Sequence, residues 1–234
     1  MGIHLITGAG SGIGAALAQR LAARGDELLL VARNEERANQ LRHSFVGAEI
    51  VVADLASPQL EDTLREHGPT PEQLDSVIHA AGIVELNAVA NLPTSEFLDT
   101  LLVNLVSPIT LTRWALPALR AARGSVIFVN SGAGLIASPN WASYAASKAG
   151  LRAAADALRA EEAPNGVRVT TVFPGRTATP MQQAVRRQEG GNYDASDYLD
   201  PDTVATAILH ALDLPRDATI PEITLRPGPH NRRR

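Results

Sequence analysis

The chain has 234 residues, of which 45% are hydrophobic and 20% charged, and this composition predicts a globular protein with a buried core. Its formal net charge of -4 gives no electrostatic attraction to nucleic acid or to an anionic membrane, so we expect neither as a partner. The chain has no cysteine and its N-terminus does not resemble a secretory signal, which together predict a cytoplasmic protein without disulfides or thiolate metal sites.

Short apolar runs of strand length alternate with longer helix-like stretches along the whole chain. The predicted strands cover residues 3–6, 28–32, 49–53, 76–80, 125–130, 167–173 and 219–225. The predicted helices cover residues 12–24, 34–43, 59–67, 95–122, 142–161 and 201–212. This alternation is typical of βαβ crossovers, so we predict an α/β fold: a single Rossmann-type, doubly wound domain whose parallel sheet has about seven strands and helices on both faces.

The predicted domain covers residues 1–228, because no linker and no internal repeat divides this part of the chain. Residues 179–200 are the least patterned segment, and they follow a predicted strand at the edge of the sheet where lids form, so we interpret them as a candidate substrate lid. Residues 229–234 end in three arginines, which we interpret as a solvated basic tail rather than a nucleic-acid-binding arm.

A glycine-rich turn, TGAGSGIG, occupies residues 7–14 between the first predicted strand and an alanine-rich helix. Free backbone N–H groups at the start of a helix attract a pyrophosphate, and glycines let it approach the backbone closely. A plain strand-to-helix turn would also use glycine, but four glycines within seven residues favour dinucleotide binding. The residues predicted to contact the cofactor here are Gly8, Gly10, Ser11, Gly12, Ile13 and Gly14.

The end of the second predicted strand, Val31-Ala32-Arg33, indicates which dinucleotide binds. An acidic residue in this region would bind the ribose hydroxyl of NAD, whereas Arg33 can pair with the additional phosphate of NADP. A charge-assisted hydrogen bond of roughly 1.5–3 kcal/mol would favour NADP about 10- to 150-fold. The alternative is that Arg33 only begins a solvated helix.

Four polar residues further along the chain suggest a reaction centre. Tyr144 and Lys148, in the sequence YAASK, share one face of a predicted helix, one turn apart. Ser131 follows the fifth predicted strand, and Asn104 lies in the long helix before that strand. Each residue alone is a weak signal, but in combination with the glycine turn they indicate a catalytic site.

In these motifs the sequence resembles the classical form of the short-chain dehydrogenase/reductase family. The resemblance covers almost the whole chain and is carried by TGAGSGIG, Asp54-Leu55, Ala81-Gly82, Asn104, Ser131, YAASK and Pro174-Gly175-Arg176-Thr177-Ala178-Thr179. It implies a catalytic tetrad of Asn104, Ser131, Tyr144 and Lys148. It also implies cofactor contacts from Asp54, Leu55, Ala81, Gly82, Tyr144, Lys148, Pro174, Gly175, Thr177 and Thr179, with Asp54 at the adenine and the two threonines at the nicotinamide carboxamide.

These roles fit the chemistry of the residues. The pKa of a free tyrosine, about 10, is too high for efficient proton exchange near neutrality, and a lysine ammonium about 4 Å away would lower it by about three units. We therefore expect Lys148 to lower the pKa of Tyr144 and to bind the nicotinamide ribose. Ser131 would orient the substrate oxygen, and Asn104 would hold a proton-relay water by interrupting its helix near Pro108.

Two segments depart from the family pattern. The segment usually written N-N-A-G reads His79-Ala80-Ala81-Gly82, and we expect His79 to be a packed strand-end residue rather than a catalytic base. Ser11 stands where NADP-preferring members often carry a basic residue, so the predicted preference for NADP(H) over NAD(H) depends chiefly on Arg33.

The sequence thus predicts an oxidoreductase that transfers a hydride between NADP(H) and a small-molecule alcohol or carbonyl substrate. A non-catalytic NADP(H)-sensing protein on the same fold is the alternative, and an epimerase or dehydratase is a third reading. The substrate class stays open, as does the role of Arg176. We also expect a homodimer or homotetramer packed through the helices at 95–122 and 142–161, whose apolar residues could equally belong to the core: Leu98, Leu101, Leu102, Leu105 and Leu151.

Overall fold

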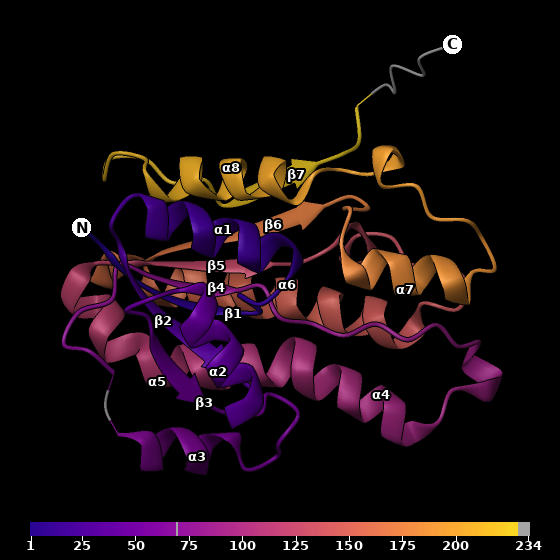
Figure 1. Ribbon diagram of the computed structural model, residues 1–234, viewed down its shortest axis with the longest axis horizontal. Coiled ribbons are helices and arrows are strands. Elements are labelled where there is room, and N and C mark those ends of the chain that lie inside the picture. The colour runs from indigo at the N-terminus through magenta and orange to yellow at the C-terminus, as the bar shows by residue number, and fades with distance from the viewer. Residues whose placement is uncertain (69, 229–234) are drawn as a thin grey trace.

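The computed structural model describes residues 1–68 and 70–228. Seven strands form one parallel sheet in the order β3-β2-β1-β4-β5-β6-β7 (Figure 1). The strands are β1 (Ile3–Thr7), β2 (Glu27–Ala32), β3 (Glu49–Val52), β4 (Ser76–His79), β5 (Ser125–Val129), β6 (Arg168–Pro174) and β7 (Glu222–Leu225). The strand order changes direction between β1 and β4, which is where doubly wound sheets bind their ligands. The predicted fold is confirmed, and all seven predicted strands are present.

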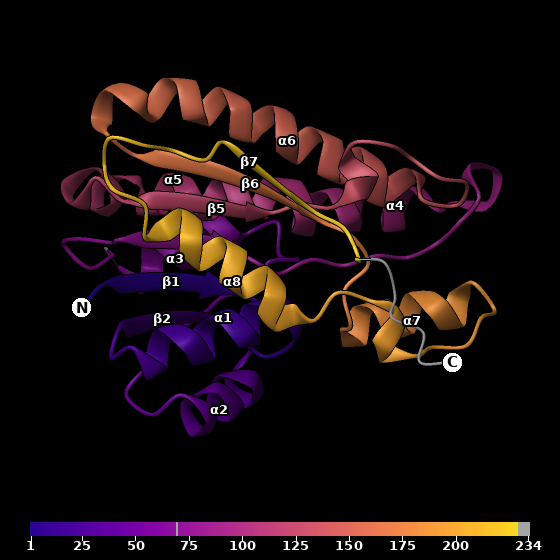
Figure 2. The ribbon, with the colours of Figure 1, turned by 90° about the horizontal axis from the view of Figure 1, so that it is seen from above.

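Helices cover both faces of this sheet. They are α1 (Gly12–Ala23), α2 (Glu35–Ser44), α3 (Leu60–His67), α4 (Thr94–Leu101), α5 (Ser107–Ala122), α6 (Ala142–Glu162), α7 (Pro180–Gln188) and α8 (Pro201–Leu212). The core on one face contains side chains of α1, α2 and α8, and the core on the other contains side chains of α3, α5 and α6. Figure 2 shows α1 and α2 on the side of the sheet opposite α6.

Strand β2 shows why these apolar runs form buried strands. Leu28 and Leu30 pack into the core on the α1 side, whereas Leu29 and Val31 pack into the core on the α5 side. Successive side chains of a strand point to opposite faces, so a strand covered on both faces needs an uninterrupted apolar run.

The predicted helix at residues 95–122 is not continuous. A π turn at Leu102–Val106 separates α4 from α5 and contains Asn104. The Asn104 amide bonds both backbone groups of Ile83, which holds the widened turn in place, and Pro108 at the start of α5 provides no N–H. The predicted local interruption of this helix is confirmed.

The candidate lid segment, residues 179–200, contains the helix α7, which the sequence pattern did not reveal. The Thr179 hydroxyl caps this helix by accepting a bond from Gln182 N at 3.1 Å, and Pro180 begins it. Only Gln182 and Val185 of α7 are buried, and five of its nine residues are Gln or Arg, so this short helix offers little apolar surface by which the sequence could identify it. The expected basic tail, residues 229–234, lies outside the described residues.

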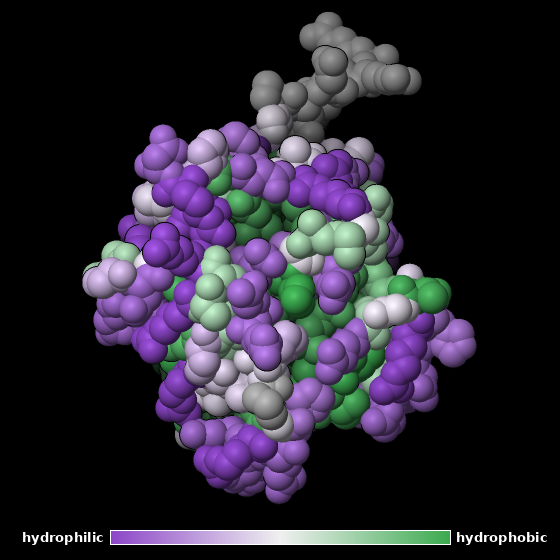
Figure 3. All heavy atoms as spheres, turned by 90° about the vertical axis from the view of Figure 1, so that its left-hand side faces the viewer, coloured by the Kyte–Doolittle hydropathy of each residue, from purple (hydrophilic) through white to green (hydrophobic). Residues whose placement is uncertain are grey.

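The two ends of the sheet differ in character. At the carboxyl ends of the strands, α4 and α7 extend beyond the sheet (Figures 1 and 2). The opposite end presents mainly hydrophilic residues around smaller hydrophobic areas (Figure 3). Among residues 1–68 and 70–228, no helix has both the length and the hydropathy needed to cross a membrane.

Candidate active site

A cavity of about 1290 Å³ lies beyond the carboxyl ends of the strands. It exceeds the range of about 300–1,000 Å³ typical of small-molecule sites, so it has room for a dinucleotide and a second molecule. It is lined by most of the residues predicted from the sequence: Gly8, Gly10, Ser11, Gly12, Ile13, Arg33, Asp54, Leu55, Ala81, Gly82, Ser131, Tyr144, Lys148, Pro174, Gly175, Thr177 and Thr179. Gly14 and Asn104 lie behind this lining.

The glycine turn after β1 forms a cradle that no other residue type fits. Gly8 and Gly12 have positive φ angles of 72° and 55°. A Cβ on Gly8 would lie 2.7 Å from Ala81 N, and one on Gly14 would collide with the carbonyl oxygen of Gly8. The turn is therefore packed tightly against α1 and the end of β4 while its N–H groups stay at the positive end of α1, which fits a pyrophosphate.

Two arginines, rather than one, lie beside this cradle. Arg33 follows β2 and lines the cavity, as expected. Arg37, in the first turn of α2, also lines it and donates from Nη2 to the Gly10 carbonyl at 3.0 Å. Sequence reasoning overlooked Arg37, because Arg33 precedes the extended N-cap Asn34 and helix spacing therefore does not relate the two arginines.

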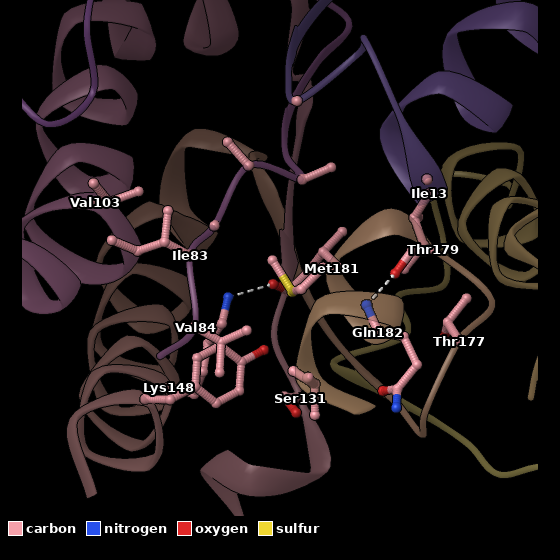
Figure 4. A pocket seen from close by; sticks show the side chains of 18 of the residues that line it. Ile13, Ile83, Val84, Val103, Ser131, Lys148, Thr177, Thr179, Met181 and Gln182 are labelled. Carbon is pink, nitrogen blue, oxygen red and sulfur yellow. Dashed lines mark hydrogen bonds between the residues drawn. The ribbon is translucent and has the colours of Figure 1, made fainter. Parts of the chain in front are cut away.

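The predicted reaction centre forms at the other end of the cavity (Figure 4). Tyr144 and Lys148 lie on α6, and Ser131 follows β5 by two residues. Figure 4 shows Lys148 and Ser131 at the cavity. Lys148 is only 3% exposed and donates from Nζ to the Val129 carbonyl at 2.9 Å. Its Nζ lies 5.8 Å from the centre of the Tyr144 ring. The structure thus brings Ser131, Tyr144 and Lys148 together at one wall of the cavity.

Burial dominates the acid–base properties of this cluster. Burial lowers the pKa of Lys148 to about 8. The expected lowering of the Tyr144 pKa by Lys148 is not met in the structure: burial raises the pKa of Tyr144, and the only opposing influence is a hydrogen bond with Ser131. The reason is that desolvation of the phenolate outweighs the attraction of an ammonium that bonds to Val129 instead.

Asn104 lies immediately behind the cavity wall and is fully buried. Its Oδ1 accepts a bond from Ile83 N at 2.9 Å, and its Nδ2 donates to the Ile83 carbonyl at 2.8 Å and to Ser147 Oγ at 3.1 Å. A Cβ on Gly82 would lie 3.1 Å from Asn104 Oδ1 and 3.8 Å from Lys148 Nζ. Gly82 therefore leaves a small space between Asn104 and Lys148.

Asn130 joins the two elements that carry the cluster, and sequence reasoning did not single it out. Its side chain donates to the carbonyl of Lys148 at 2.9 Å and accepts a bond from Ser131 N at 2.7 Å. One buried amide thus fixes the serine after β5 relative to the lysine on α6. Its only sequence signal is its place directly before Ser131.

His79 is a packed strand-end residue, as predicted. It is 2% exposed, stacks on Phe128 with ring centres 5.0 Å apart, and bonds Thr112 Oγ1 from Nε2 at 2.7 Å. Burial lowers its pKa to about 3, so the imidazole is neutral at physiological pH.

Ion pairs hold the C-terminal end of α7 above the cavity. Arg176 donates to both carboxylate oxygens of Glu189, and Arg186 bonds the same carboxylate. These two cations lower the pKa of Glu189 to about 2. Gln188 Oε1 accepts a bond from Leu86 N at 2.8 Å, which links α7 to the segment after β4. Arg176 is therefore committed to the lid segment, a role that the sequence left open.

Two further residues line the cavity and were not foreseen. The Gln182 amide is buried, and its Nε2 has no hydrogen-bond partner among the described residues. Arg226 follows β7 and reaches the cavity beside Gly132. Neither residue belongs to a recognisable motif, because each is brought to the site by the folding of a distant segment.

The buried lysine predicts how stability depends on pH. The pKa of Lys148 is about 8 in the folded protein and 10.5 in the unfolded chain. Between these values the unfolded chain binds the proton that the folded protein has released, so stability rises with pH. The free energy of unfolding of wild type relative to Lys148→Met should increase by up to about 3 kcal/mol across this interval.

Urea unfolding of both proteins at about pH 7 and about pH 9.5 measures this difference. All other titrating groups are common to wild type and Lys148→Met, so their effects cancel in the difference between the two proteins. Parallel pH dependences of the two proteins would contradict a lowered lysine pKa.

Comparison with known proteins agrees with this geometry. The family model described as short chain dehydrogenase matches residues 3–190. Two proteins named as uncharacterized oxidoreductases are similar to this chain: one from Staphylococcus epidermidis is 30% identical and one from Staphylococcus aureus is 32% identical, and each alignment covers 96% of both chains. The solved alcohol dehydrogenase of Thermococcus sibiricus, complexed with 5-hydroxy-NADP, is 26% identical with a TM-score of 0.83, over 97% of this chain and 99% of that one. The chain belongs to the short-chain dehydrogenase/reductase family of oxidoreductases.

Proposed function

We propose that the protein transfers a hydride between NADP(H) and an alcohol or carbonyl substrate. The observation that carries this proposal is the cavity itself, which joins the glycine cradle at one end to Ser131, Tyr144 and Lys148 at the other. The glycine cradle would hold the pyrophosphate of a dinucleotide, Asp54 would hold its adenine, and Thr177 and Thr179 would hold its carboxamide. When bound, the nicotinamide supplies or accepts the hydride.

In this proposal the protein's own residues handle the proton. Ser131 hydrogen-bonds the substrate oxygen and fixes it in place for hydride transfer. Tyr144 donates its proton to that oxygen during reduction and accepts it during oxidation. Lys148 binds the nicotinamide ribose, and its charge stabilises the phenolate that Tyr144 becomes. The hydrogen bond with Ser131 opposes the desolvation that raises the Tyr144 pKa.

After reduction of the substrate Tyr144 must regain a proton, and the space beside Gly82 lies next to the lysine that passes it on. We propose that a water between Asn104 and Lys148 returns the proton to Tyr144 by way of Lys148. The glycine at position 82 supports this role, because a Cβ there would lie 3.1 Å from Asn104 Oδ1 and 3.8 Å from Lys148 Nζ and would fill the space between them. Asn104 itself stays fixed by Ile83 and Ser147, so it positions the relay without entering the cavity.

The first test of the proposal is Tyr144→Phe. This variant keeps the ring but removes the proton donor, so turnover should fall at least about 100-fold while NADPH binding is retained. Loss of NADPH absorbance with a panel of ketones, aldehydes and keto esters measures turnover, and fluorescence titration measures binding.

The same experiment addresses the alternative functions. Binding of NADPH without turnover of any compound in the panel would favour an NADP(H)-sensing protein. Turnover that persists in Tyr144→Phe would contradict the assigned proton donor.

The preference for NADP(H) is assigned to Arg33 and Arg37. Both guanidinium groups lie beside the glycine cradle, and the related alcohol dehydrogenase of Thermococcus sibiricus is described with an NADP derivative. Substitution of either arginine by alanine should lower the ratio of kcat/KM for NADPH to that for NADH about tenfold or more.

The matched control for these variants is Arg42→Ala. Arg42 also lies on α2, but it pairs with Glu35 and does not line the cavity. An unchanged cofactor ratio in Arg33→Ala and in Arg37→Ala would assign the preference elsewhere.

A homodimer or homotetramer is also proposed. Leu151 belongs to the core at 1% exposure, but Leu98 on α4 and Val106 at the π turn are 57% and 47% exposed. Exposed apolar side chains of this kind fit an interface between copies of the chain. Light scattering at micromolar concentration should give at least a dimer, and Leu98→Glu should weaken it.

The control for this substitution is Val46→Glu, since Val46 is 94% exposed on a different part of the surface. A monomeric wild type would refute the assembly. Residues 179–200 as a substrate lid, residues 1–228 as one domain and a cytoplasmic location stay predictions.

A further inference from the structure

The part of the cavity near Ser131 contains a cation whose purpose the proposed reaction does not explain. Arg226 follows β7, and its Nη1 donates to the carbonyls of Phe173 and Leu225 at 3.2 and 3.1 Å. Within the described part of the chain, both of its hydrogen bonds to protein come from Nη1, and it forms no ion pair with a carboxylate. The side chain is exposed at the cavity, so Nε and Nη2 stay available to a ligand.

The contact with Gly132 shows where this guanidinium lies relative to the reaction centre. A Cβ on Gly132 would lie 3.4 Å from both Nη1 and Nη2 of Arg226. Gly132 directly follows Ser131, and neighbouring Cα atoms are about 3.8 Å apart. The guanidinium therefore stands over the residue next to the serine that orients the substrate oxygen.

The other cations at this end of the cavity already have hydrogen-bond partners within the described part of the protein. Arg176 forms a two-pronged pair with Glu189, and the buried Lys148 donates to the Val129 carbonyl. The remaining lining near Tyr144 is largely apolar and includes Val84 and Val185. An anionic group on the substrate would complement the positive charge that Arg226 leaves uncompensated in this lining.

We propose that Arg226 binds a carboxylate of the substrate, so that the protein reduces short oxo acids or oxidises the corresponding hydroxy acids. This inference rests on the proposed oxidoreductase function. A planar guanidinium forms two parallel hydrogen bonds with a carboxylate, whose geometry it matches. The short separation between Gly132 and Ser131 requires the carboxylate to lie within a few bonds of the reacting carbonyl.

A second observation points to the same kind of ligand. Gln182 is 7% exposed and lines the same cavity, and its Nε2 is buried without a hydrogen-bond acceptor. An unpaired buried donor destabilises the protein, and a ligand oxygen that accepts its hydrogen bond removes this cost. The cavity thus presents an unpaired amide donor in addition to the guanidinium, and both require ligand oxygens as acceptors.

The test compares acids with their neutral esters. Pyruvate, acetoacetate and levulinate, each beside its methyl ester, are offered with NADPH to wild type and to Arg226→Gln. Wild type should prefer at least one acid over its ester, and the ratio of kcat/KM for acid to ester should fall about tenfold or more in the variant. Arg226→Lys keeps the charge but loses the planar fork, so it should recover part of this ratio.

Arg152→Gln is the matched control. Arg152 pairs with Glu222 at the start of β7, whereas Arg226 follows the end of that strand, and Arg152 does not line the cavity. This variant should keep the acid-to-ester ratio of wild type. Equal NADPH affinity in all variants verifies that the cofactor end of the cavity is intact.

The outcomes separate this inference from the function on which it rests. Reduction of esters or neutral ketones without preference for any acid, or a preference unchanged in Arg226→Gln, would overturn the carboxylate site and leave the reductase standing. If no compound is turned over, calorimetry with β-hydroxybutyrate and the NADP-loaded protein decides: saturable binding that weakens about tenfold in Arg226→Gln supports the site, and absence of binding overturns it.

Discussion

The hydrogen bond from Lys148 Nζ to the carbonyl of Val129 is the contact on which the arrangement of the active site depends. It ties the middle of α6 to the last residue of β5, and Asn130 reinforces it by bonding the carbonyl of the same lysine. Burying an ammonium group destabilises a folded protein, and burial accordingly lowers the pKa of Lys148 to about 8. The same bond keeps the lysine in place near Tyr144. The position of Lys148 is thus set by one strand-to-helix contact, and its pKa by burial.

Much of the fold follows from local sequence signals. The strands could be predicted because both of their faces are buried, which requires apolar runs such as the one in β2. The glycine turn could be predicted because Gly8 and Gly12 adopt conformations that other residues avoid. Tyr144 and Lys148 of YAASK lie one turn apart on the same helix face, so their meeting near one cavity wall is a consequence of helix geometry alone.

Other features depend on contacts between distant segments and left little trace in the sequence. Helix α7 has only two buried residues, so its stability comes from the Thr179 cap and from ion pairs such as Arg176 with Glu189. Arg226 reaches the cavity only because β7 pairs with β6. The Tyr144 pKa could not be predicted from the sequence for a different reason. Spacing identifies Lys148 as a charged neighbour, but the desolvation of Tyr144, which dominates its pKa, depends on how the folded chain packs around it.

The π turn at Leu102–Val106 determines the orientation of α5 as well as that of Asn104. A π turn contains one residue more than the α-helical turn it replaces, and in an α-helix one residue corresponds to a rotation of about 100°. The phase of α5 is therefore set by this extra residue, and with it the face that carries Leu111, Ala115 and Leu119 into the core. If the turn became regular α-helix with all of its residues retained, this apolar face would rotate by about 100° away from the sheet. The π turn that orients Asn104 therefore also determines which face of α5 packs into the core, so a change in the turn changes the core packing.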